Sequence, residues 1–187
     1  MKAKALLNQG VDSARRRDYR SAIARFNRVI RRLPDYDKGY YNRGLAYYDL
    51  GRYEAAIADF TTAIQLNPDY RHAYINRGNA YRHIGNLDAA QQDFDRSIEL
   101  APDEPKSYSS RGLLRLDRED YEGAIQDFDQ ALALQPNLPK GYLWRGFAWL
   151  RFEEPQLAIA DLDRALAYDP DCAEGYNNRG LAYCALA

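Results

Sequence analysis

Arginine and aspartate are the residues of this chain whose spacing most resembles a chemical site. An arginine recurs every 34 residues, and an aspartate recurs with the same period 16 residues later. The arginines are Arg43, Arg77, Arg111, Arg145 and Arg179, and the aspartates are Asp59, Asp93, Asp127 and Asp161. A carboxylate beside a cation can serve in acid–base catalysis. An enzyme needs one such pair, whereas this chain carries four, so we interpret them as structural ion pairs.

The first copy of the pattern indicates how these residues pair. It has Gln9 where the others have arginine, and Arg25 where the others have aspartate. If each aspartate faced the arginine of the following copy, Arg25 would face Arg43. We therefore expect each arginine to pair with the aspartate of its own copy, because a buried guanidinium needs a carboxylate partner.

Other chemically capable residues are sparse. Cys172 and Cys184 lie 12 residues apart along mostly helical chain, too far for a disulfide, so we expect free thiols and a cytoplasmic location. His72 and His83 lie about 16 Å apart on one predicted helix, too far to share a metal ion. The sequence has no nucleophile elbow and no phosphate-binding loop. We expect no catalysis, metal or cofactor.

The elements that must position these residues repeat with the same period. Prolines stand at Pro34, Pro68, Pro102, Pro136 and Pro170. With each proline at position 32, the repeats span 3–36, 37–70, 71–104, 105–138 and 139–172, and 173–187 begins a sixth. A fixed period of this length is typical of a solenoid.

Small and large residues recur at fixed positions within each repeat. Position 8 is always glycine, position 20 is alanine, and position 24 is phenylalanine or, in repeat 5, Leu162. The apolar spacing predicts two helices of about 14 residues per repeat, with the small residues facing each other where the helices touch. Gly51 and Gly85 mark the turn between these helices, where a positive φ is expected.

These positions resemble the tetratricopeptide repeat (TPR) superfamily. Repeat 2 carries the pattern as Tyr40, Asn42, Arg43, Gly44, Ala46, Tyr47, Gly51, Tyr53, Ala56, Phe60, Ala63 and Pro68. The resemblance covers nearly the whole chain. It implies an all-α, right-handed superhelical solenoid of antiparallel helix pairs, formed as a single domain by five repeats and one extra helix. It also implies that the first helices line a concave face that binds peptides.

Composition narrows the classes of partner. The chain has 26 basic and 27 acidic residues, a net charge of −1, which argues against a nucleic-acid partner. No apolar run approaches the ~20 residues of a membrane span, so we expect no membrane contact. The N-terminal residues lack the apolar segment of a signal peptide and are predicted to form the first helix.

The resemblance places candidate binding residues at positions 2, 5, 6, 9, 12 and 13. In repeats 2 and 3 these positions are polar, with asparagines whose amides suit the backbone of an extended peptide. In repeats 4 and 5 they are mostly apolar, which suits a hydrophobic anchor, and Trp144 is the strongest candidate. An alternative is that these apolar side chains pack on neighbouring helices. The candidates are Asn42, Asn76, Asn79, Lys106, Leu113, Lys140, Leu143, Trp144, Phe147 and Leu150.

Some family members bind acidic C-termini of chaperones through a carboxylate clamp, and this chain matches the clamp only in part. One three-repeat window offers Asn76 and Lys106, and the next offers Asn79 and Lys140. The other clamp positions hold different residues, including Trp144, so the resemblance does not favour this ligand.

The final predicted helix carries Tyr176, Leu181, Tyr183 and Leu186 with no second helix to cover them. Solenoids normally end in a polar cap. The principal hypothesis is a non-catalytic scaffold that binds a peptide or helix of a protein partner. The alternatives are a module that forms homo-oligomers through this helix, or a regulatory part of a larger enzyme.

Overall fold

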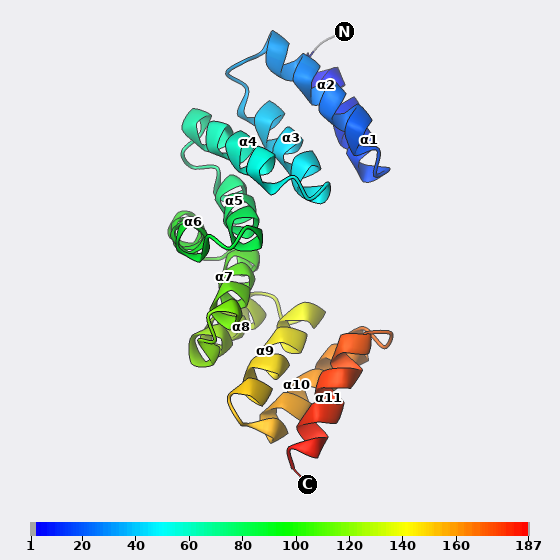
Figure 1. Ribbon diagram of the computed structural model, residues 1–187, viewed down its shortest axis with the longest axis vertical. Coiled ribbons are helices and arrows are strands. Elements are labelled where there is room, and N and C mark those ends of the chain that lie inside the picture. Colours follow the sequence, from blue (N-terminus) through cyan, green and yellow to red (C-terminus); the bar gives the residue numbers. More distant parts are fainter. Residues whose placement is uncertain (1–2, 187) are drawn as a thin grey trace. The chain divides into compact units, whose positions relative to one another are not determined.

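A computed structural model describes residues 3–186, and these form eleven helices joined by short turns (Figure 1). The helices fall into two compact units, which divide between Leu100 and Ala101. The first unit contains α1 (Ala3–Arg15), α2 (Tyr19–Arg32), α3 (Asp37–Asp49), α4 (Tyr53–Leu66), α5 (Arg71–His83) and α6 (Leu87–Leu100). The second contains α7 (Pro105–Asp117), α8 (Tyr121–Leu134), α9 (Pro139–Arg151), α10 (Pro155–Tyr168) and α11 (Ala173–Cys184).

Each repeat is a helical hairpin, as its apolar spacing predicts. The tightest packing joins the two helices of one repeat, such as α3 with α4 or α9 with α10. Within a unit, the second helix of one repeat packs on the first helix of the next, as α2 does on α3. The all-α solenoid fold is confirmed. The single domain and the superhelical hand stay predictions.

The turn inside each repeat requires a left-handed residue. Gly51 and Gly85 adopt φ values of +71° and +78°, which confirms their predicted role. The same position holds Arg17, Glu119 and Glu153 in the other complete repeats, with φ of 60° to 62°. Side chains with a Cβ rarely adopt this conformation, so three of the five turns are strained.

Glycine at position 8 receives the ring of position 24 in its own repeat. A Cβ built on Gly44, Gly78 or Gly112 would lie 2.7 to 2.9 Å from the nearest phenylalanine ring carbon, and one on Gly10 would lie closer still. In repeat 5 the nearest atom belongs to Leu162, at 2.9 Å. The nearest neighbour of each of these glycines is therefore the large side chain, and in repeat 5 the expected contact with alanine is present as well, because Ala158 O lies 3.3 Å from a Cβ on Gly146. The phenylalanines are completely or almost completely buried.

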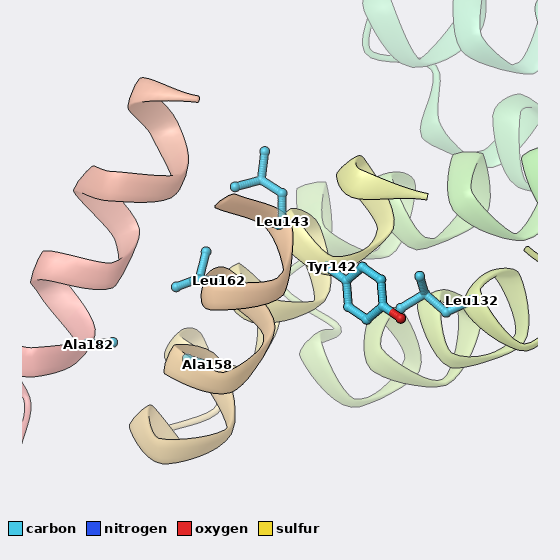
Figure 2. Close-up of a cluster of buried hydrophobic side chains, with 7 residues drawn as sticks. Leu132, Tyr142, Leu143, Ala158, Leu162 and Ala182 are labelled. Carbon is cyan, nitrogen blue, oxygen red and sulfur yellow. The ribbon is translucent and has the colours of Figure 1, made fainter. Parts of the chain in front are cut away.

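In the second unit, one core cluster joins four helices. Leu132 of α8, Leu143 of α9, Leu162 of α10 and Ala182 of α11 belong to it, together with Tyr142 (Figure 2). This cluster holds α9 and α10 in place and therefore fixes the face of α9 that carries Trp144.

Candidate functional site

The periodic arginines and aspartates form ion pairs inside each repeat. Arg43 and Asp59 are 2.6 Å apart, and Arg77 and Asp93 are 2.7 Å apart. Arg111 with Asp127 and Arg145 with Asp161 repeat the arrangement at 2.7 and 2.6 Å. Each arginine donates through Nε and Nη2 to both oxygens of its carboxylate. The predicted pairing within repeats is confirmed, and four equivalent pairs indicate a structural role.

The same arginines also link neighbouring repeats, which the sequence reasoning missed. In the first unit, Nη1 of Arg43 donates to Asn27 and Nη1 of Arg77 donates to Thr61. In the second unit, Arg145 donates to Asp129 at 2.6 Å. All three acceptors occupy position 25 of the preceding repeat, so the recurrence of polar residues there was the available signal. Arg25 of repeat 1 bonds instead to Ser13 of α1.

Burial and pairing act in opposite directions on these groups. Burial raises the pKa of Asp93, and the hydrogen bonds and charge of Arg77 partly offset that rise. The hydrogen bonds from Arg145 to Asp161 raise the pKa of Arg145 and keep its guanidinium charged. The pairs therefore offset part of the cost of burying charge between two helices.

The asparagines of the first unit are partly occupied by the protein itself. Asn42 of α3 donates to the Lys38 carbonyl at 2.7 Å. Asn76 of α5 donates to the Tyr41 hydroxyl and to the His72 carbonyl, both at 2.9 Å. Both amide hydrogens of Asn76 are thereby used, which weakens the hypothesis that an asparagine row binds a peptide backbone.

A cavity of about 490 Å³ lies between α7 and α9 in the second unit, and it collects four of the predicted candidates. Leu113 and Trp144 form apolar walls, while Lys106 and Lys140 stand at the rim. We call this the α7–α9 cavity. Its complete lining is Glu104, Pro105, Lys106, Ser109, Leu113, Phe128, Gln135, Leu138, Lys140, Gly141 and Trp144.

The helix boundaries explain why these side chains converge. Lys106 and Lys140 both lie in the first turn of a helix, directly after a proline that begins it. Ring contacts fix Trp144, because its indole meets the Phe147 ring edge-on at a centroid distance of 6.3 Å. Trp144 also packs on two core clusters, so one face of the indole is anchored.

The other apolar candidates do not line this cavity. Leu143 is only 4% exposed and packs in the core cluster of the second unit, and it also lines a separate small hollow with Lys140 and Cys172. Its role as a binding residue stays a prediction. Leu150 is partly buried against the same cluster, and Phe147 contacts Trp144 without lining the cavity itself. Asn79 lies on α5, in the first unit.

Seven of the eleven lining residues were not among the predicted candidates, including Phe128, Gln135 and Leu138. Phe128 was assigned to the core, yet it also contributes to the cavity wall. Gln135 and Leu138 belong to the connection between α8 and α9, outside the positions that the family resemblance marks. Their proximity to the repeat-ending Pro136 places them beside the first turn of α9.

The last described helix has an uncovered apolar face. Tyr176, Leu181, Tyr183 and Leu186 are each between 45% and 54% exposed. A Cβ on Gly180 would meet no atom within 4 Å, unlike one on the other position 8 glycines. Leu186 follows α11, which ends at Cys184, and we call the four apolar residues together the α11 face.

Other functional groups in the described part of the chain do not assemble into a site. No group of three metal-ligating side chains occurs within residues 3–186. Both cysteines are free, Cys172 half-buried and Cys184 exposed. Among the same residues, no helix has the length and apolar character needed to cross a bilayer.

Family models match almost the whole chain from residue 38 onward. A tetratricopeptide repeat model matches residues 38–70 and 72–104, a TPR repeat model matches 112–151, and a further tetratricopeptide repeat model matches 148–186. The chain belongs to the tetratricopeptide repeat family, whose fold is a typical non-catalytic interaction scaffold. No curated protein matches it significantly in sequence.

Solved structures of similar fold are distant in sequence. The thermophilic TPR protein TTC0263 from Thermus thermophilus is 21% identical, with 99% of both chains covered and a TM-score of 0.77. MamA from Desulfovibrio magneticus RS-1 is 22% identical over 91% of this chain and 97% of its own, with a TM-score of 0.78. YrrB, described as a TPR protein with an unusual peptide-binding site, is 16% identical over 96% and 92%, with a TM-score of 0.73. These likenesses establish the fold.

Proposed function

We propose that this protein is a non-catalytic scaffold that holds a peptide segment of a protein partner in the α7–α9 cavity. The observation that carries the proposal is the cavity itself, a hollow of about 490 Å³ with apolar walls and a charged rim. Ligand pockets commonly have volumes of ~300–1,000 Å³ and apolar walls with a few polar groups. The family's role as an interaction scaffold supports the same conclusion.

Trp144 is the residue that we expect to contribute most to binding. It is partly exposed at the cavity wall, while its ring is held by Phe147 and by the core. An anchored aromatic side chain loses little conformational entropy when it binds a partner. Truncation of such a residue at an interface typically costs ~2 kcal/mol or more.

The rim indicates the chemistry of the bound segment. Lys106 and Lys140 are exposed, and the rim includes one carboxylate, Glu104. The rim therefore has a net positive charge, and the N-termini of α7 and α9 add to it. We expect a segment with an aromatic or branched apolar residue in the cavity and an acidic residue near the lysines.

The test is selection from a random peptide display library followed by calorimetric titration. Selected peptides should share the apolar and acidic residues, and Trp144→Ala should weaken their binding at least about 30-fold. Phe152→Ala is the matched control, because Phe152 is an exposed aromatic residue of the same hairpin, 46% accessible and outside the cavity. Equal affinity for both variants would rule out this site.

A second candidate function is self-association through the α11 face. The observation that favours it is the exposure of four large apolar side chains beside Gly180, which leaves room for close helix contact. Light scattering at increasing concentration should reveal a dimer that Leu181→Ser and Tyr183→Ser abolish together. A monomer at all concentrations would contradict this candidate. The cytoplasmic location and the absence of nucleic-acid and membrane partners stay predictions.

A further inference from the structure

The small net charge of the chain is the sum of two regions whose net charges have opposite sign. Residues 1–36 contain ten lysines and arginines against three aspartates, a net charge of +7. Residues 37–187 contain 16 basic and 24 acidic residues, a net charge of −8. The balance that argued against anionic partners therefore does not hold for repeat 1.

Helix α2 concentrates this positive charge on one face. Its sequence contains five arginines and no carboxylate. At 100° per residue the arginines lie within an arc of about 140°, and Arg20 and Arg32 are about 18 Å apart along the axis. The opposite side is buried through Ala22, Phe26 and Val29. We call Arg20, Arg25, Arg28, Arg31 and Arg32 the arginine face.

Most of the arginine face is accessible to a partner. Arg20, Arg28, Arg31 and Arg32 are exposed, whereas Arg25 is half-buried and donates to Ser13. Carboxylates lie near both ends of α2: Asp12 of α1 and Asp18 precede it, and Asp35 follows it and lines a hollow together with Arg32. Asp12 is 3.7 Å from Arg15, and the side chain of Asp18 caps α2. None of these carboxylates is on α2 itself.

The other repeats show that folding does not require this charge. The position of Arg20 holds Glu54, Asp88 and Glu122 in repeats 2 to 4. The position of Arg32 holds leucine in those same repeats. The buried positions of α2, by contrast, keep the alanine and phenylalanine that the other repeats use. Arg20 and Arg32 therefore change the charge of the exposed surface, whereas Arg25 replaces the buried aspartate of the other repeats.

A hollow of about 360 Å³ adjoins the arginine face. It is lined by Arg20 and Ile23 of α2 and by Leu50 and Arg52 of the turn between α3 and α4. Leu50 is 42% exposed, and the Arg52 guanidinium lies 4.8 Å from the centre of the Tyr47 ring, which helps to hold it in place. Two guanidinium groups therefore flank an apolar surface.

We propose that the arginine face and this hollow bind an acidic protein segment that carries a branched apolar side chain. Guanidinium groups bind carboxylates in a forked geometry, and the apolar surface accepts the aliphatic side chain. A phosphate backbone matches the arginines but supplies no side chain for the hollow. Insertion of α2 into a bilayer would require an exposed apolar helix face, and that face of α2 is buried in the protein.

Fluorescence anisotropy with a labelled peptide tests the proposal. The probe is a peptide of about a dozen residues, mainly glutamate and aspartate, with one central leucine. A second peptide has serine in place of the leucine. Single-stranded RNA of similar charge and vesicles with phosphatidylserine are compared at the same ionic strength. We expect the leucine peptide to bind best and its affinity to fall with added salt.

Variants locate the site and leave the fold intact. Arg20→Gln with Arg28→Gln should weaken binding about tenfold, since each exposed pair contributes a few-fold. The control is Arg96→Gln with Arg164→Gln, which removes the same charge from exposed arginines at the position of Arg28 in repeats 3 and 5. This control should bind like the wild type. Leu50→Ser should weaken the leucine peptide and leave the serine peptide unchanged.

Each other outcome overturns the proposal. Tighter binding of RNA or vesicles than of the leucine peptide would assign the arginine face to a different partner class. Equal binding of the two peptides would show that the hollow has no role. Equal losses in the variant and the control would show that only the overall charge matters, and the absence of peptide binding would reject the site.

Discussion

The contact between glycine and phenylalanine predicts opposite effects for one substitution at two equivalent positions. Gly78→Ala places a Cβ 2.7 Å from Cε1 of Phe94, well inside the ~3.5–4.0 Å of ordinary carbon contacts. Phe94 is completely buried, so its ring cannot move without displacing other core atoms. Overpacking of this kind costs about 1–3 kcal/mol of unfolding free energy. Gly180→Ala meets no atom within 4 Å.

Helix propensity acts in the same direction at both sites. Alanine stabilises a helix interior by ~0.8–1.0 kcal/mol relative to glycine. Gly180→Ala should therefore stabilise α11 by up to about 1 kcal/mol, whereas Gly78→Ala should be neutral or destabilising by up to about 2 kcal/mol. Urea unfolding followed by circular dichroism measures the global effect of Gly78→Ala. Amide hydrogen exchange in α11 measures the local effect of Gly180→Ala, because a terminal helix of a solenoid can unfold separately. Equal stabilisation at both positions would refute the packing argument.

Three further predictions concern the ion pairs, the strained turns and the cysteines. Asp93→Ala should destabilise the protein by about 3–5 kcal/mol, because it leaves Arg77 half-buried without its carboxylate. The control Glu99→Ala breaks the exposed pair with Arg96 and should cost at most about 1 kcal/mol. Equal shifts in melting temperature for the two variants would contradict the structural role of the buried pair. Glu119, Glu153 and Gly51 all have φ between 60° and 71°, so Glu119→Gly and Glu153→Gly should each raise the free energy of unfolding by about 1 kcal/mol, and Gly51→Ala should lower it by a similar amount. Urea unfolding midpoints measure these changes. A loss of stability in both glycine variants would contradict the strain. Cys184 should react with a maleimide faster than Cys172, in line with their exposure, and mass spectrometry of the partly labelled protein would expose the reverse order.

The repeat architecture could be predicted from the sequence because the residues that recur every 34 positions are ones that the fold constrains. The glycine at position 8, the large residue at position 24 and the proline at position 32 recur since each satisfies a local steric requirement. The ion pairs were predictable for a similar reason. The four equivalent copies and the exception at Arg25 indicated that the aspartate at position 23 pairs with the arginine of its own repeat.

The candidate site was harder to predict because its residues do not repeat. The family resemblance marked the positions of Lys106, Leu113, Lys140 and Trp144, and the structure brings these residues around one cavity. Leu143, marked in the same way, does not line this cavity, because it packs in the core cluster with Leu162 of α10. The position of a residue in the repeat determines which side of its helix it occupies. Whether a cavity lies beside that residue depends on side chains from other helices.

The measurement that most directly tests the central claim is the tryptophan emission of the Trp149→Phe protein during titration with a selected peptide. Trp144 is then the only tryptophan in the chain, and it lies in the wall of the α7–α9 cavity. The account predicts a saturable change in emission whose midpoint matches the calorimetric affinity. Peptide binding with unchanged Trp144 emission would contradict it.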